Sequence, residues 1–272
     1  RTVDSQAMPD AKPLKPPKTP KPRQPSKPAA RRSASTAVVD DLPAPMNQIR
    51  DLACAGRHAA AIELAGAALG AADVGADVRL ELLERRAESL MAEGDLKRAG
   101  ADAAAMKRIA QASRDPAHEA RSLNREALLQ IRSGKSRAAL VTTALALKAA
   151  QTAGRLDLQA RSLVLLAEAQ YRSRKNLDAA LAQATRGAEL FERLGDAVEH
   201  GRALWVLASV HSTRGEPADA ERVATQALLL GRRSGDLLGQ GNALNLLTFN
   251  SADLAARLNL LKQSLAAFEA AG

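Results

Sequence analysis

Cysteine, aromatic residues and long apolar runs are scarce in this chain of 272 residues. Its one cysteine, Cys54, has no partner for an internal disulfide, and nothing in the sequence resembles a metal-ligand cluster. Aromatic residues make up only 2% of the sequence, and β-branched runs of strand length are absent, which argues against a β-sheet. No apolar stretch approaches the roughly 20 residues that a membrane-spanning helix needs. We therefore expect a helical protein without cofactors and without membrane insertion.

The N-terminal region is polar and rich in proline, so it does not have the pattern of a secretory signal peptide. Together with the single cysteine, this favours a reducing, cytoplasmic location. Because the chain begins with Arg1 rather than Met, we also expect further residues upstream.

Residues 1–42 differ in composition from the rest of the chain. They hold eight of the 12 prolines, and residues 1–36 carry a net charge of +7 whereas the other 236 residues carry only +2. Such a segment cannot bury enough apolar surface to fold, so we predict a disordered linker over residues 1–42. A ligand for a proline-binding domain or for an acidic surface is the alternative. The nearly neutral remainder predicts that the folded body binds no nucleic acid.

From residue 44 onward the sequence is rich in Ala and Leu, and a period near 40 residues appears. The segment that starts at Leu80 aligns with segments that start at Ala120, Ala160, Gly201 and Gly241. Small residues recur inside these units, at Ala87, Ala127, Ala167 and Ala208 and again at Ala99, Ala139, Ala180 and Ala220. Turn glycines recur at Gly94, Gly134 and Gly215, with Lys175 in the equivalent place of the third unit.

These sets of residues at equivalent positions of successive units, which we call columns, predict a pair of helices in each unit. A glycine tolerates the positive φ that ends the first helix, and the alanines allow two helices to pack closely. One helix pair cannot cover its own leucines, which recur at Leu83, Leu123, Leu163, Leu204 and Leu244. Only a stacked neighbour covers them, so the units must form a solenoid.

We therefore predict an all-α fold, a right-handed superhelix of stacked antiparallel helix pairs over residues 44–272. Its units span about 44–79, 80–119, 120–159, 160–200, 201–240 and 241–272. Ser251 is the expected cap of the last helix. Since no polar capping helix follows that unit, we expect the array to continue beyond Gly272.

These columns resemble the tetratricopeptide repeat over residues 44–272. The family's motif has a small residue at position 8, Gly at 15, Ala at 20 and Ala at 27. The matching residues are Ala127, Gly134, Ala139 and Ala146 in one unit, and Ala208, Gly215, Ala220 and Ala227 in another. The chain departs from the family in its longer period and in its lack of the family's aromatics. This longer form is similar to the repeat regions of large bacterial signalling proteins, including class III adenylate/guanylate cyclases and transcription regulators.

Two patterns that suggest chemistry fail on inspection. Residues 133–136 (Ser-Gly-Lys-Ser) look like the end of a phosphate-binding loop, but Leu129 stands where the motif requires Gly, and a helix precedes it instead of a strand. The four histidines lie far apart, and no pair has the i,i+4 spacing of a helical metal site. We expect no catalytic residues, so any catalytic domain would lie outside this chain.

The resemblance implies which residues line a concave groove, because the first helix of each tetratricopeptide pair faces it. Carried over position by position, the partner-binding residues are Arg121, Asn124, Arg161, Tyr171, Arg172, Arg202, Trp205, Asn242 and Asn245. Arginine suits carboxylates, asparagine pairs with peptide backbone, and Trp and Tyr anchor interfaces. This predicts a groove for an extended or helical peptide of acidic character. In the alternative, the arginines pair with Glu119, Asp157 and Glu199 on preceding loops, and Trp205 is ordinary core.

The resemblance thus implies a non-catalytic interaction, sensory or scaffold module for a protein or peptide partner. The alternative is the regulatory repeat region of a larger bacterial signalling enzyme, such as a cyclase, or of a transcription regulator.

Overall fold

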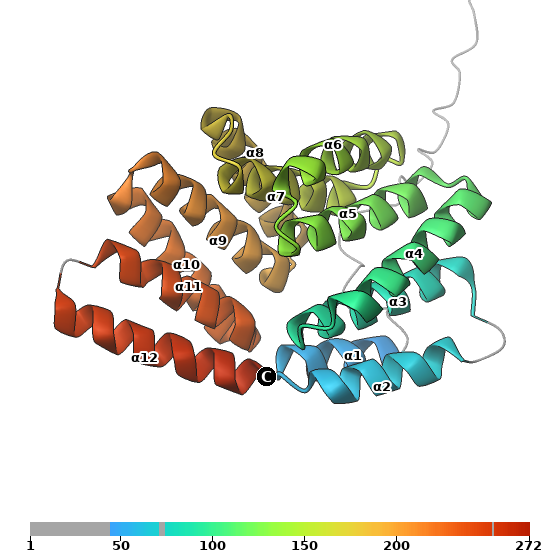
Figure 1. The fold of residues 1–272 in the computed structure, drawn as a ribbon, viewed down its shortest axis with the longest axis horizontal. Helices are drawn as coiled ribbons and strands as arrows, with labels where there is room; N and C mark the ends of the chain where they lie inside the picture. The colour runs from blue at the N-terminus through green and yellow to red at the C-terminus, as the bar shows by residue number, and fades with distance from the viewer. Residues whose placement is uncertain (1–43, 71–73, 252) are drawn as a thin grey trace, which may run out of the picture. The chain divides into compact units, whose positions relative to one another are not determined.

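The computed structural model describes residues 44–70, 74–251 and 253–272, and this part of the chain contains twelve α-helices and no strand. The predicted linker, residues 1–42, lies outside the described residues. The helices form six antiparallel pairs (Figure 1). The pairs are α1 (Ala44–Cys54) with α2 (His58–Leu69), α3 (Ala76–Ala92) with α4 (Leu96–Ser113), α5 (Pro116–Arg132) with α6 (Ser136–Thr152), α7 (Leu156–Arg172) with α8 (Leu177–Leu194), α9 (Ala197–Arg214) with α10 (Pro217–Ser234), and α11 (Leu237–Asn250) with α12 (Leu254–Ala271).

The helices are arranged in two layers. Each helix packs on its neighbours in the sequence, and the first helix of each pair packs also on the first helix of the next pair. In the described residues no comparable contact joins consecutive second helices. The first helices therefore form one layer and the second helices cover it from the other side. This arrangement confirms the predicted all-α fold of stacked antiparallel helix pairs.

The repeat columns fall at one register of the first helices. Leu80, Ala120, Ala160, Gly201 and Gly241 are each the fifth residue of a first helix. Each first helix therefore begins four residues before the point at which the sequence alignment places the start of its unit. The residue that follows each of these five lies at an equivalent place on its helix, which brings the predicted arginine column onto one layer.

Positive φ angles close the first helix of a pair, as the glycine column predicts. Gly94 has φ +77°, and the amide of the next residue, Asp95, donates to the carbonyl of Leu90 at 2.8 Å. The fourth pair, α7 with α8, has no glycine at this place, and Arg174 adopts the turn with φ +52°. The assignment of Lys175 to this position was wrong by one residue, since its amide makes the bond to Gln170 that Asp95 makes to Leu90.

Aspartates begin several of the helices. Asp95, Asp115, Asp196 and Asp236 each accept a hydrogen bond from a backbone amide in the first turn of the helix that follows. The last helix follows the same rule, because Asp253 accepts from the amides of Ala255 and Ala256. The expectation that Ser251 caps this helix was therefore wrong. An aspartate directly before the helix satisfies two amides that a serine two residues earlier does not reach.

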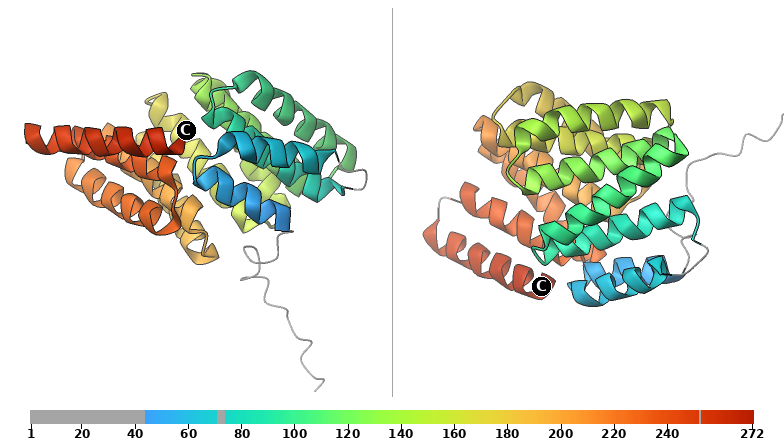
Figure 2. Two further views of the ribbon diagram at one scale, coloured as in Figure 1. Left: turned by 90° about the horizontal axis from the view of Figure 1, so that it is seen from below. Right: turned by 45° about the vertical axis from the view of Figure 1, so that its right-hand side comes forward.

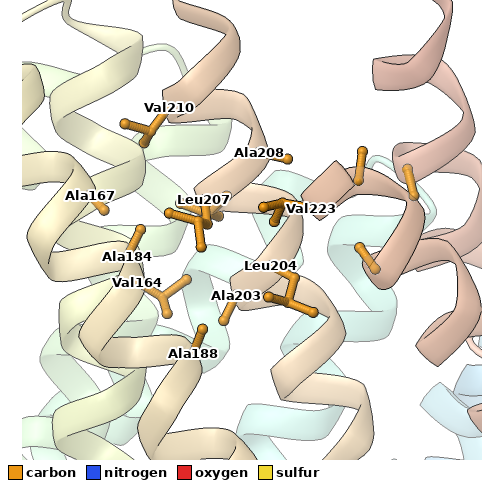
Figure 3. Close-up of a cluster of buried hydrophobic side chains, with 14 of the residues drawn as sticks. Val164, Ala167, Ala184, Ala188, Ala203, Leu204, Leu207, Ala208, Val210 and Val223 are labelled. Carbon is orange, nitrogen blue, oxygen red and sulfur yellow. The ribbon is translucent and has the colours of Figure 1, made fainter. Parts of the chain in front are cut away.

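Alanine allows the close packing between layers. The eight residues of the two predicted alanine columns are fully buried. Figure 3 shows how such residues, among them Ala167, Ala184 and Ala203, interleave with Val164 and Leu204 in the core of the later pairs. At one place even alanine is too large, because a Cβ on Gly187 would lie 2.6 Å from Cγ2 of Val164.

The last helix ends against the turn of the first pair. A Cβ on Gly56 would lie 2.3 Å from the carbonyl oxygen of Ala270, and Ala271 is buried. Figure 2 shows the end of α12 beside α1 and α2 in both views. The first and last pairs of the array therefore support each other directly.

Candidate functional site

The arginine column of the first helices lies in a network of ion pairs. Arg121 on α5, Arg161 on α7 and Arg202 on α9 are each partly buried, and each faces a glutamate on another helix or turn of the layer. We call the set formed by the five arginines Arg85, Arg121, Arg125, Arg161 and Arg202 and the four glutamates Glu81, Glu84, Glu88 and Glu199 the inner network.

One end of the inner network joins α5 to α3. Nη1 of Arg121 lies 2.5 Å from Oε2 of Glu81, and its Nε lies 3.6 Å from Glu84. Glu81 also accepts a hydrogen bond of 2.9 Å from Arg85, one turn along the same helix. Glu81 thus pairs with two arginines, and α3 supplies both glutamates at this end of the network.

The other end joins α7, α9 and α3. Arg161 lies 2.8 Å from Glu199, which stands at the start of α9. Arg202 contacts the same glutamate at 3.3 Å and also forms a hydrogen-bonded ion pair with Glu88 of α3. This contact connects two first helices that are not neighbours in the stack.

Electrostatics keep the central glutamate ionised. Burial by itself would raise the pKa of Glu88, but the combined charges of Arg202, Arg125, Arg85 and Arg161 hold it well below the usual 4.5. The pKa of Glu81 is also lowered, because Arg85 and Arg121 outweigh the effect of burial. The guanidinium pKa values of Arg161 and Arg202 rise for the reciprocal reason. These shifts keep Glu81, Glu88, Arg161 and Arg202 charged at neutral pH. By residue count the inner network holds five arginines and four glutamates.

Sequence reasoning missed Arg125, the most deeply buried member. Its side chain is 1% exposed, and only Nη2 has a partner, Glu84 at 3.4 Å. Its Nε and Nη1 have no hydrogen-bond partner among the described residues. One available signal was the spacing of Glu81, Glu84, Arg85 and Glu88, which places three carboxylates and one arginine on one face of α3. Such an acidic face requires basic partners on a neighbouring helix.

The predicted asparagines do not act together. Asn124 is buried between α5 and α7, where its amide nitrogen donates to the carbonyl of Leu158 at 3.3 Å and its oxygen accepts from Ser162 at 2.9 Å. It therefore joins two repeats and is closed to a partner. Asn242 is half-buried and Asn245 is exposed, both on α11.

The predicted aromatics lie partly within the core. Tyr171 and Trp205 both pack against the largest cluster of buried apolar residues. Burial raises the pKa of Tyr171 to about 12. Arg172 lies over the Tyr171 ring, 5.4 Å from its centroid, and donates to Glu168 at 2.9 Å. This second cluster stands at the opposite end of α7 from Arg161.

Of the three acidic residues that the alternative hypothesis pairs with the arginine column, only Glu199 does so. Glu199 pairs with Arg161 and Arg202, as that hypothesis required. Asp157 instead forms a two-bond ion pair with Arg155, at 2.9 and 2.7 Å. Glu119 forms no ion pair with the predicted arginines in the described part of the chain.

The described residues hold no group of His, Cys, Asp and Glu side chains that would bind a metal ion. Across the same residues, no helix has the length and apolar character that crossing a membrane requires. The segment that resembles a phosphate-binding loop is a turn between α5 and α6, where Gly134 has φ +73°. Its role as a hairpin turn is thereby confirmed.

Similarity to known proteins is confined to structure. No protein-family model matches the sequence, and no curated protein matches it. A crystal structure of a Rap protein complexed with competence and sporulation factor has a TM-score of 0.58 at 12% identity, with 83% of this chain and 76% of that chain covered. BtubC from P. vanneervenii has a TM-score of 0.53 at 18% identity, with 85% and 90% covered.

A third similar structure is a signal-transduction ATPase with numerous domains from Pyrococcus horikoshii, which has a tetratricopeptide repeat sensor. Its TM-score is 0.53 at 14% identity, with 80% of this chain and 34% of that chain covered. At these identities the likeness concerns the fold alone. With the helix pairs and their columns, it shows that the chain has a tetratricopeptide-like helical repeat fold.

Proposed function

We propose that this chain is a non-catalytic interaction module, and that the layer of first helices binds a carboxylate-bearing peptide or protein segment. The observation that carries the proposal is the geometry of Arg202. Its side chain is 32% exposed, and its hydrogen bonds to Glu88 and Glu199 both use Nη1 as the donor. The Nε and Nη2 edge of the guanidinium is thus directed to neither glutamate, and this edge suits a carboxylate.

The inner network restricts which predicted residues contact a partner. Arg121 and Arg161 are committed to glutamates of this chain, and Asn124 is buried. Arg172 and Arg202 retain more exposure, and Asn245 is open. In this proposal the partner binds chiefly through these three residues, while the other arginines set the local positive charge.

The similar structures support the choice of function class. One is a Rap protein complexed with a factor, and another carries a tetratricopeptide repeat sensor within a longer chain. The repeat sensor within a longer chain also favours the alternative that this chain is the sensory region of a larger signalling protein. A cyclase or a transcription regulator remains a candidate for that parent protein.

The test is a peptide selection against the purified chain, followed by binding measurements with the selected peptides. We expect enrichment of peptides rich in Asp and Glu. The variant Arg172→Gln/Arg202→Gln should weaken their binding, whereas Arg232→Gln/Arg233→Gln, at exposed residues at the end of α10, should not. Both variants lose two positive charges, so the comparison separates a local site from net charge. Equal binding by both variants would overturn the inner-layer site.

A further inference from the structure

The second helices leave a hollow open on the opposite layer. α2 has 12 residues, whereas every other second helix in the described part has 17 or 18. Beside its end at Leu69, residues of α3 and α4 line a shallow hollow of about 320 Å³ that is widely open to solvent. We call this feature the outer hollow.

The floor of the outer hollow is apolar. Leu83 of α3 is 5% exposed, and Leu69 and Ile109 are partly buried against the same cluster, which includes Met106. The floor is therefore continuous with the packing that holds α3 to α4. The floor presents apolar surface to the hollow, and apolar surface of this kind favours an apolar occupant.

The rim of the outer hollow is cationic. It carries Arg79, Arg86 and Arg108. Arg86 binds Asp102 through two hydrogen bonds of 2.9 and 2.6 Å, which neutralises that carboxylate. Among the described residues Arg79 and Arg108 form no ion pair. Within the part of the chain that the structure describes, two guanidinium groups beside the apolar floor thus have no anionic partner.

We propose that the outer hollow binds a peptide segment of a partner protein that presents a large apolar side chain flanked by carboxylates. The apolar side chain lies on Leu69, Leu83 and Ile109, and the carboxylates contact Arg79 and Arg108. The volume lies near the lower end of the range for ligand pockets, about 300–1,000 Å³, and suits one or two side chains. Its open side suits a segment that continues beyond the hollow better than a small enclosed molecule.

This site is separate from the inner network, and neither proposal needs the other. The outer hollow lies between second helices and over α3, and none of its lining residues belongs to the inner network. A partner that uses both sites would gain affinity from the linkage of two contacts.

The experiment uses a short labelled peptide with two leucines among Asp and Glu residues, and fluorescence anisotropy with the whole chain. Replacing Arg79 and Arg108 with Gln should weaken binding about tenfold, the effect of losing roughly 1.4 kcal/mol. Ala105→Phe, which fills the hollow from α4 without changing charge, should abolish binding. The matched control Arg232→Gln/Arg233→Gln should bind as the parent does. Circular dichroism checks that every variant keeps its helices.

Several outcomes would overturn the proposal. They are no saturable binding by the parent chain, equal binding of a peptide in which Ser replaces both leucines, and equal losses in the hollow and control variants. Loss of binding in Arg172→Gln/Arg202→Gln with full binding in the hollow variants would assign the peptide to the inner network and reject the outer hollow.

Discussion

Arg202 of α9 donates a hydrogen bond to Glu88 of α3, although 114 positions of sequence separate the two residues. Consecutive first helices pack on one another throughout the array, but this ion pair connects helices that belong to the second and fifth pairs. A direct contact also joins Gly56 to the end of α12. The stack is therefore held by contacts between distant repeats as well as by contacts between neighbours.

The inner network predicts a specific dependence of stability on pH. The pKa of Glu88 is depressed in the folded chain, and the unfolded chain has the ordinary value near 4.5. The stabilisation is fully present above that value and declines as the pH falls below it, because the unfolded state then binds protons that the folded state does not. We expect Glu88→Gln to lower the free energy of unfolding by about 2 kcal/mol at pH 7, with a smaller difference at pH 3.

Urea denaturation at the two pH values measures this effect. The control is Glu189→Gln, which removes an exposed ion pair with Arg186 within one helix turn. Such pairs contribute about 0.5 kcal/mol or less, so the control should change little at either pH. A difference between parent and Glu88→Gln that stays constant from pH 7 to pH 3 would contradict the ionised state of Glu88.

Two asparagines from the predicted groove should behave differently. Asn124→Ala removes the bonds to Leu158 and Ser162 from a buried position, and should cost about 1–3 kcal/mol of unfolding free energy. Asn245→Ala, at an exposed position on α11, should change stability by about 0.5 kcal/mol or less. Thermal unfolding distinguishes the two variants. Similar stabilities would show that the bridge between α5 and α7 contributes nothing.

The repeat pattern was enough to predict the fold, because each column reports a local requirement. Ala87 and its equivalents mark close helix packing, and Gly94 and its equivalents mark a positive φ. In the pair α7 with α8 no glycine marks the turn, because Arg174 adopts the positive φ there. The predicted position of this turn, at Lys175, was therefore wrong by one residue. The stabilising hydrogen bonds of the turn impose this conformation regardless of residue type.

The site was less predictable for a physical reason. The position of Arg202 on the layer of first helices followed from its column, but its contact with Glu88 depends on how the stack curves over several repeats. That curvature sums small rotations between pairs, and no single column records it. The buried state of Asn124 was missed because its bridge to Ser162 depends on the spacing of two helices.

Alanine should have opposite effects on stability at two helical glycines, because only one of them is closely packed. A Cβ on Gly187 would lie 2.6 Å from Val164 and 3.2 Å from the carbonyl of Ala160, so Gly187→Ala should destabilise by about 1–3 kcal/mol. Gly100 lies inside α4 with nothing within 4 Å of its would-be Cβ, and Gly100→Ala should stabilise by about 0.5–1 kcal/mol. Urea denaturation measures the change in the free energy of unfolding for both variants. A stabilising Gly187→Ala would show that α8 has room to move away from α7.

The contact between the first and last pairs predicts a distant effect of one substitution. Gly56 and Gly94 both have positive φ, at +72° and +77°, so alanine at either position pays the same backbone strain of about 1–2 kcal/mol. Only at Gly56 would the new Cβ also overlap Ala270 and Ala271 at the end of α12. Gly56→Ala should therefore destabilise more than Gly94→Ala. It should also raise hydrogen exchange in the last turns of α12, which Gly94→Ala should leave unchanged. Equal protection of α12 in the two variants would mean that the end of this helix is held by α11 alone.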